Sequence, residues 1–262
     1  MPKRFLAPSL GLMAALVFSI AVHAQTSRPA KTGQSKTASP VPDLSGIWVE
    51  AGAPGSGIKL APGAMNFRRF TKEDPPLQPW ALEKFKYNRE GVTDPNESGL
   101  DERDPEESCY PIGPTRIYAI PRPIEIVQTP RQILLLSEWD HTVRRIYLDG
   151  REHPPGYPYG WEGHSIGKWD GDTLVIDTID TRPETWVDGI GTPHTEELHV
   201  VERLRRVKPD TLEVDVQFDD PKAYTKTWGG KKTFILKPKF EILDHVNCEE
   251  WLEMGKHRAL PQ

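Results

Sequence analysis

The chain has 262 residues, of which 33 are basic and 38 acidic, and its formal net charge is −5 at pH 7. This balance argues against nucleic acid as a partner, because binding to phosphates needs a basic surface. The length is sufficient for one large domain or two small ones.

The first 24 residues are predicted to be a cleaved signal peptide. Two basic residues precede an apolar run over residues 10–22, and small residues lead to a cleavage site after Ala24. The run is too short to cross a bilayer comfortably, and no cysteine follows the cleavage site to carry a lipid. We therefore expect a periplasmic or secreted protein without a membrane span, with a disordered leader over residues 25–41 and a single β-rich domain over residues 42–262.

The expected domain begins with one strand and one helix. Residues 42–50, PDLSGIWVE, hold β-branched and aromatic residues behind a turn and predict a first strand. Prolines followed by apolar residues at near-helical spacing predict a helix over residues 75–88. Residues 94–107 contain seven acids and one basic residue, which indicates an exposed loop.

From residue 115 onward the apolar residues recur with a period of two, which is typical of strands. Short turns such as DGD, KPD and DDP connect most of the segments, as in an antiparallel meander. The predicted fold class is therefore all-β, either a single antiparallel barrel or a two-sheet meander, with one short N-terminal helix. The expected strands cover residues 115–120, 124–129, 132–139, 142–148, 165–169, 173–178, 196–207, 211–218, 223–228 and 232–238.

Two segments resemble known families. The sequence LSGIW, followed by an up-and-down meander, is similar to the G-x-W strand of lipocalins and the wider calycin barrels, which implies a calycin-like barrel. The segments GHSIGKWDGDTLVIDT and PHTEELHVVERLRRVKPDTLEV resemble a family of uncharacterised exported bacterial proteins, over residues 109–250. This second resemblance implies export and carries no activity with it.

The stretch GHSIG has the G-x-S-x-G form of the nucleophile elbow, in which a strand, a sharp turn and a helix expose a reactive serine. A segment rich in proline and glycine precedes it, and a β-prone segment with the turn DGD follows. Neither flank supplies the required strand or helix. We therefore interpret Ser165 as an ordinary hydroxyl at a strand edge.

Inward-facing polar residues are expected on the strand PHTEELHVVERL. Alternation places His194, Glu196 and Glu202 on its more apolar face, together with Leu198 and other aliphatic residues. Buried carboxylates and imidazoles need partners, and Arg145 is the expected bidentate partner for an inward glutamate. This pair either fixes the register of the sheet or belongs to a site.

The connection between His153 and His164 is long for a hairpin and contains three aromatic residues, Tyr157, Tyr159 and Trp161. It is either a packed surface loop or a loop that folds over the mouth of the barrel and stacks on a flat ligand. If its ends meet His194 and Glu196, the group forms an acid–base set or a site for a metal with three histidines and one carboxylate. The sequence does not choose between them, and the cofactor stays unknown.

Two further patterns concern cysteines and calcium. Cys109 and Cys248 are expected to form a disulfide, because an exported protein meets an oxidising compartment and neither has a nearby partner for zinc. Residues 94–105 match the start of a calcium-binding loop, but Pro105 occupies the position of the bidentate glutamate. An acidic solvated loop is the simpler interpretation.

The sequence therefore predicts an exported β-barrel that takes a small organic molecule into a mouth lined by histidine, glutamate and arginine. The expected ligand-binding residues are His141, Arg145, His153, Tyr157, Tyr159 and Trp161. If the protein is an enzyme, His164, His194 and Glu196 are the expected catalytic residues of an acid–base or metal-assisted hydrolase, lyase or isomerase. An envelope scaffold without a ligand is the third alternative.

Overall fold

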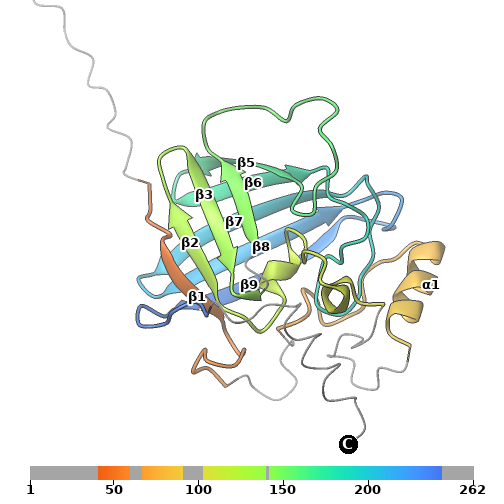
Figure 1. Ribbon diagram of the computed structural model, residues 1–262, viewed down its shortest axis with the longest axis horizontal. Helices are drawn as coiled ribbons and strands as arrows, with labels where there is room; N and C mark the ends of the chain where they lie inside the picture. The colour runs from red at the N-terminus through yellow and green to blue at the C-terminus, as the bar shows by residue number, and fades with distance from the viewer. Residues whose placement is uncertain (1–40, 60–66, 91–102, 140–141, 244–262) are drawn as a thin grey trace, which may run out of the picture. The chain divides into compact units, whose positions relative to one another are not determined.

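Alternating apolar residues build nine strands in the computed structural model, which describes residues 41–59, 67–90, 103–139 and 142–243 (Figure 1). One α-helix and two short 3-10 helices accompany the strands. The strands are β1 (Gly46–Glu50), β2 (Ile124–Gln128), β3 (Gln132–Ser137), β4 (Val143–Tyr147), β5 (His164–Asp170), β6 (Thr173–Ile179), β7 (His199–Lys208), β8 (Thr211–Asp219) and β9 (Trp228–Leu236). No helix in the described ranges is long and apolar enough to cross a membrane.

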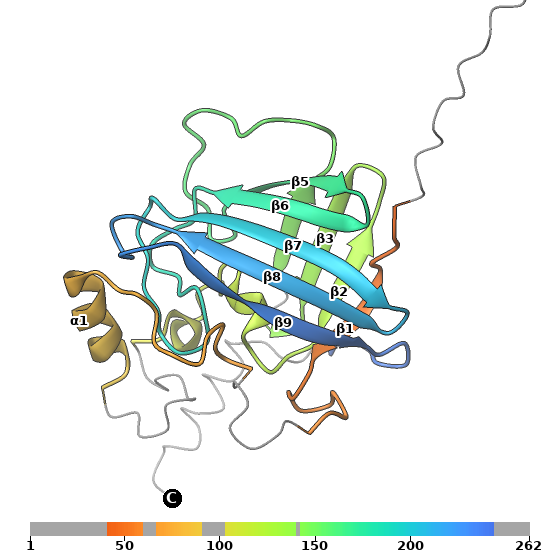
Figure 2. The ribbon, with the colours of Figure 1, turned by 180° about the vertical axis from the view of Figure 1, so that it is seen from behind.

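The strands follow one another around a closed barrel in chain order, and β9 pairs with β1 to close it (Figures 1 and 2). This confirms the predicted all-β class and selects a single barrel over two packed sheets. The prediction of a purely antiparallel meander is wrong at one place, because β4 and β5 run parallel. A parallel pair needs a crossover, and residues 148–163 supply it. They form the long green connection at the top of Figure 1.

The core fills the interior of the barrel, as the alternation on β8 illustrates. Its inward residues Leu212, Val214, Val216 and Phe218 are all at most 1% exposed, while polar residues between them face outward. On β1, Trp48 is fully buried and donates its indole N–H to the carbonyl oxygen of Leu44 at 2.9 Å. The interior is therefore occupied by side chains over most of its length.

Helix α1 (Pro79–Asn88) confirms the predicted helix but begins four residues later than expected. Proline occupies its first turn, where the missing N–H costs no hydrogen bond. The residues before it are extended, and Leu77 forms a β-bridge with Tyr224. The indole N–H of Trp80 donates to the carbonyl oxygen of Lys222 at 2.7 Å, which fastens the start of the helix to the segment before β9.

Two expected strands are absent from the described structure. Residues 115–120 are buried at every position, so they do not alternate, and they contain the 3-10 helix η2 (Arg116–Tyr118). Arg116 is fully buried and binds Asp104 through two hydrogen bonds of 2.7 Å, next to η1 (Pro105–Ser108). Residues 223–228 likewise form no strand before β9 begins at its last residue.

Candidate functional site

Strand alternation places His164 on the outer wall of the barrel. Its neighbour Ser165 is 1% exposed and lies inside, where its hydroxyl is 2.9 Å from that of Thr178 on β6. The same alternation puts Asp177 on the outside of β6. His164 is nevertheless only 4% exposed, because aromatic side chains of β4 and of the connection 148–163 pack against its ring.

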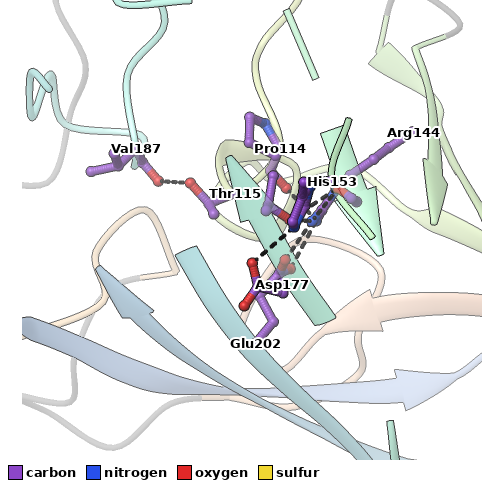
Figure 3. A network of polar contacts seen from close by, with 9 residues as sticks. Pro114, Thr115, Arg144, His153, Asp177, Val187 and Glu202 are labelled. Atoms are coloured by element: carbon purple, nitrogen blue, oxygen red, sulfur yellow. Dashed lines mark hydrogen bonds and ion pairs between the residues drawn. The ribbon is translucent and has the colours of Figure 1, made fainter. Parts of the chain in front are cut away.

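Three side chains on this wall form a continuous chain of hydrogen bonds, which we call the relay. Oδ1 of Asp177 is 3.0 Å from Nε2 of His153, and Nδ1 of His153 is 2.7 Å from Nδ1 of His164. Figure 3 shows His153 above Asp177 with the contact between them. The relay therefore joins β6, the connection and the start of β5.

The chemistry of the relay fixes where its protons lie at neutral pH. A carboxylate only accepts, so Nε2 of His153 carries a hydrogen and Nδ1 of neutral His153 accepts. Nδ1 of His164 is then the donor between the two rings, which leaves Nε2 of neutral His164 with a free lone pair. Burial lowers the pKa of His164, and the charges of His153 and Arg151 lower it further, so the neutral form is favoured.

Asp177 also contacts a second histidine, which keeps the carboxylate ionised. Nε2 of His199 on β7 is 3.1 Å from Oδ2 of Asp177. The hydrogen bond to His199 is the main cause that lowers the pKa of Asp177, and His153 adds to it. The same bond raises the pKa of His199. One carboxylate therefore binds two imidazoles, of which only His153 continues to His164.

An open groove of about 590 Å³ lies beside His164. Rings flank the imidazole on two sides, because the centroids of Tyr147 and Tyr157 are 5.6 and 4.7 Å from that of His164. The Tyr147 and His164 planes are inclined by only 28°, which is a stacked arrangement. The groove is lined by Tyr147, Asp149, Gly150, Arg151, Glu152, Pro154, Tyr157 and His164.

A clamped guanidinium lines the same groove. Nε and Nη2 of Arg151 donate to the two carboxylate oxygens of Asp149 at 2.8 and 2.6 Å. The guanidinium carbon also lies 3.7 Å from the ring centroid of Tyr147, as in a cation–π contact. The two bonds to Asp149 use two of the five N–H donors of the guanidinium. The groove therefore combines flat walls, a fixed cation and a base.

Inside the barrel, a separate polar network is centred on Arg144. Its guanidinium binds both carboxylate oxygens of Glu202 on β7, and both side chains are fully buried. It also binds the hydroxyls of Ser165 and Thr178 and the carbonyl oxygen of Pro114. Figure 3 shows Arg144 and Glu202 pointing toward one another. The inward position predicted for Glu202 is thus confirmed.

The predicted partner of Glu202 is wrong by one residue. Arg144 and Ile146 are buried on β4, whereas Arg145 lies on the exposed face. The alternation of β4 therefore runs opposite to the one expected, because Tyr147 packs on the outer wall with His164 rather than in the core. Arg145 lines neither the interior nor the described groove.

The geometry also explains GHSIG without a nucleophile. Gly163 has a φ of 61°, and a Cβ there would meet the carbonyl oxygen of Ile179 at 2.6 Å. A Cβ on Gly167 would meet the side chain of Leu148 at 2.8 Å. Close packing and the positive φ therefore require glycine at 163, and Gly167 lies in close contact with core side chains. Ser165 is not at an exposed edge as expected but fully inside, bonded to Arg144 rather than to a histidine.

Next to this network lies a second buried carboxyl group, that of Glu162. Burial raises the pKa of Glu162 to about 7, against the opposing attraction of Arg144. Glu162 is thus about half protonated at pH 7, whereas an ordinary glutamate is fully ionised there.

The expected grouping of His164 with His194 and Glu196 is not formed. His194 is buried, and its ring binds the hydroxyl of Thr185 and the carbonyl oxygen of Thr195, both at 2.8 Å. Glu196 is exposed in a turn, because β7 begins only at residue 199 and the alternation does not extend back to it. His194 is buried as expected, but it lies in the loop before β7 rather than on the strand, and the inward placement is wrong for Glu196.

The expected ligand-binding residues separate into two groups. His153 and Tyr157 contact His164 at the groove. Trp161 instead stacks on Tyr110, with centroids 4.9 Å apart, and Tyr159 is 51% exposed. The connection therefore packs against the outer wall at His164, and binding of a ligand by these residues stays a prediction. His141 lies outside the described residues.

Neither ion site expected as an alternative is found in the described ranges. No group of three or more histidine, cysteine, aspartate or glutamate side chains is placed there to hold a metal ion. Most of the loop over residues 94–105 lies outside the described residues. Cys109 follows η1 with a φ of 61°, but Cys248 is not described, so their disulfide stays a prediction.

Sequence reasoning missed Asp177, Arg151 and Tyr147. A signal for Asp177 was present, because alternation in TLVIDT puts it opposite the apolar residues Leu174 and Ile176. An outward acidic residue on a strand next to a histidine-rich connection indicates a candidate partner for a histidine. No local sequence pattern indicated that Arg151 of the connection would pack against Tyr147 of β4, the preceding strand.

Comparison with models of known families, with curated proteins and with solved structures finds no match to this chain.

Proposed function

We propose that this protein is an exported β-barrel that binds a small molecule in the groove beside His164 and acts on it by general base catalysis. The observation that carries the proposal is the relay from Asp177 through His153 to His164. Export is supported by the predicted signal peptide and by the resemblance to exported bacterial proteins. The described barrel supplies a rigid wall for the site.

His164 has the properties of a base. Its pKa is lowered, so it is neutral where a base must accept a proton. The hydrogen bond from Nδ1 to His153 fixes its tautomer and stabilises the imidazolium that forms when Nε2 takes a proton. Asp177 in turn orients His153 and balances that charge. A positioned base of this kind contributes roughly 10²–10⁴-fold to a rate.

The groove favours a flat, conjugated molecule. Its volume of about 590 Å³ suits a small organic ligand. The partly exposed ring of Tyr157 offers a π face, and Arg151 is held in place by Asp149 with donors left for an electronegative group. We infer a substrate with an aromatic ring and a group that is hydrolysed or deprotonated beside it.

Hydrolysis of 4-nitrophenyl acetate tests the proposal, because this flat ester reacts with water that a base has deprotonated. The rate should rise as pH increases through the lowered pKa of His164 and then level off. His164→Gln should reduce the rate to the solution background, and Asp177→Asn should lower it roughly 10- to 100-fold. These variants leave the interior network intact.

A matched control comes from the second buried histidine. His194→Gln changes a histidine that the structure places away from the groove, so it should hydrolyse the ester like the wild type if it folds. NMR should also show His164 protonated at Nδ1 and unprotonated at Nε2. Equal rates for the wild type and His164→Gln, or a proton on Nε2 of neutral His164, would refute the proposal.

A further inference from the structure

Two imidazole nitrogens face each other at the centre of the relay. Nδ1 of His153 belongs to the connection 148–163, and Nδ1 of His164 belongs to the barrel, 2.7 Å away. This contact requires one nitrogen with a hydrogen and one with a lone pair. If both rings are imidazolium ions, both nitrogens carry hydrogens and the contact becomes repulsive.

We propose that His153 and His164 form a pH-sensitive latch that holds the connection 148–163 on the barrel in neutral solution and releases it in acid. Release removes Tyr157 from the wall and so opens one side of the groove. The latch itself depends only on the contact between the two histidines. Its effect on catalysis rests on the proposed function.

The middle of the connection has few other polar anchors. Among the residues that the structure describes, the hydrogen bonds from residues 152–159 to the rest of the chain are those of His153. Residues on both sides are held independently. Leu148 donates its backbone N–H to Arg131, and Gly160 bonds with Asp180. Breaking the latch therefore frees a central segment while its ends stay attached.

The contact between the two rings tolerates one extra proton but not two. Arg151 and Asp180 act on His164 with opposite signs, and the rings of Tyr147 and Tyr157 cover it. One extra proton on the pair leaves one of the two Nδ1 atoms with a lone pair, so the hydrogen bond between the rings persists. A second extra proton puts hydrogens on both Nδ1 atoms.

That second proton is the one that opens the latch. On its other side, His153 faces Asp177, which is shared with His199, and His199 also faces Asp219. The carboxylate of Asp177 stabilises a charged His153, but a charged His153 and a charged His164 repel each other. The latch therefore opens only at a pH where both rings are charged.

The sign of the pH dependence follows from the lowered pKa of His164. Its pKa in the docked state lies below the ordinary value of 6.5, and the causes are burial first and His153 second. The docked state therefore binds protons less well than a released connection does. Docking is complete above pH 6.5 and weakens as the pH falls below it.

Fluorine NMR of protein labelled with 3-fluorotyrosine tests the latch without any substrate. The signal of Tyr157, assigned with Tyr157→Phe, reports packing against His164. Between about pH 7.5 and about pH 4.5 it should shift toward the position of an exposed residue and sharpen, with a midpoint below that of free histidine. The signal of exposed Tyr159 should stay sharp throughout and serves as the internal control.

Variants separate the latch from general acid unfolding. His153→Gln supplies an amide that donates and accepts without titrating, so the Tyr157 transition should disappear, while His199→Gln should retain it. If His153→Gln does not fold, His164→Gln removes the other half and should also abolish the transition. A Tyr157 signal that does not change over this pH range, or an unchanged transition in either latch variant, would overturn the proposal. Loss of ester hydrolysis alone would not affect it.

Discussion

Replacing Glu202 by glutamine should destabilise the barrel by about 3–5 kcal/mol, because it leaves a buried guanidinium without its counterion. Arg144 and Glu202 are both 0% exposed, and the carboxylate accepts two of the hydrogen bonds from the guanidinium. Glutamine has nearly the same shape, so little of this loss comes from packing. For a domain of this size, the loss corresponds to a fall in Tm of roughly 6–20 °C.

Urea unfolding followed by tryptophan fluorescence measures this free energy. The matched control is Asp172→Asn, which breaks a 3.0 Å ion pair with Arg205 on the outside of the barrel. Both side chains there are more than half exposed, so the cost should stay below about 1 kcal/mol. The double variant Arg144→Met, Glu202→Leu removes both charges and should recover most of the loss. If Glu202→Gln unfolds like the wild type, within about 1 kcal/mol, the reasoning is refuted.

Two further changes probe the same end of the interior. Glu162→Gln should stabilise the protein at about pH 8 and have little effect at about pH 4. The pKa of Glu162 is raised from 4.5 to about 7, so the wild type loses up to about 3 kcal/mol as the pH rises through this range, and unfolding curves that coincide at both pH values would contradict this. Ser165→Ala should cost about 1 kcal/mol in urea unfolding, the value of a hydrogen-bonded hydroxyl. A fluorophosphonate should not label the wild type, and a covalent adduct on Ser165 would contradict its buried position.

Much of the barrel could be predicted because its strands alternate cleanly. On β8 every second residue is apolar, and each of these faces the core, so period and burial agree. Residues 115–120 have a similar composition, but the segment is buried on all sides and adopts a 3-10 turn. Alternation predicts a strand only where one face meets solvent.

The direction of β5 was not predictable from its own residues. Each strand of a parallel pair has the same local pattern as one in an antiparallel pair, and only the length of the connection differs. The length of residues 148–163 does not settle the direction, because the longer connection 180–198 joins the antiparallel strands β6 and β7. The aromatic residues of 148–163 predicted a covering loop. The loop does pack over His164, but it also returns the chain so that β5 runs in the same direction as β4.

Part of the candidate site could be predicted from the positions of its residues along the chain. His153 and His164 were expected to act together because they flank one connection, and they are in hydrogen-bonding contact. The face of β4 was assigned wrongly because Val143 and Tyr147 are apolar or aromatic yet lie on the outer side. Arg144 is a buried charged residue, and hydrophobic periodicity does not predict a charged residue in the core. Asp177 lies on β6, and no sequence motif in that strand indicated that it would join the relay.

The short pairing between β4 and β5 has a consequence for assembly between copies of the chain. Only two residue pairs join these strands, Ile146 with Ser165 and Tyr147 with Ile166, although β4 has five residues and β5 has seven. Most of their backbone groups on this side therefore lie outside the ladder. Such groups are a template for strand addition and aggregation, which closed barrels otherwise avoid. A connection that folds back beside this short joint is also placed to keep a second molecule from extending the sheet there.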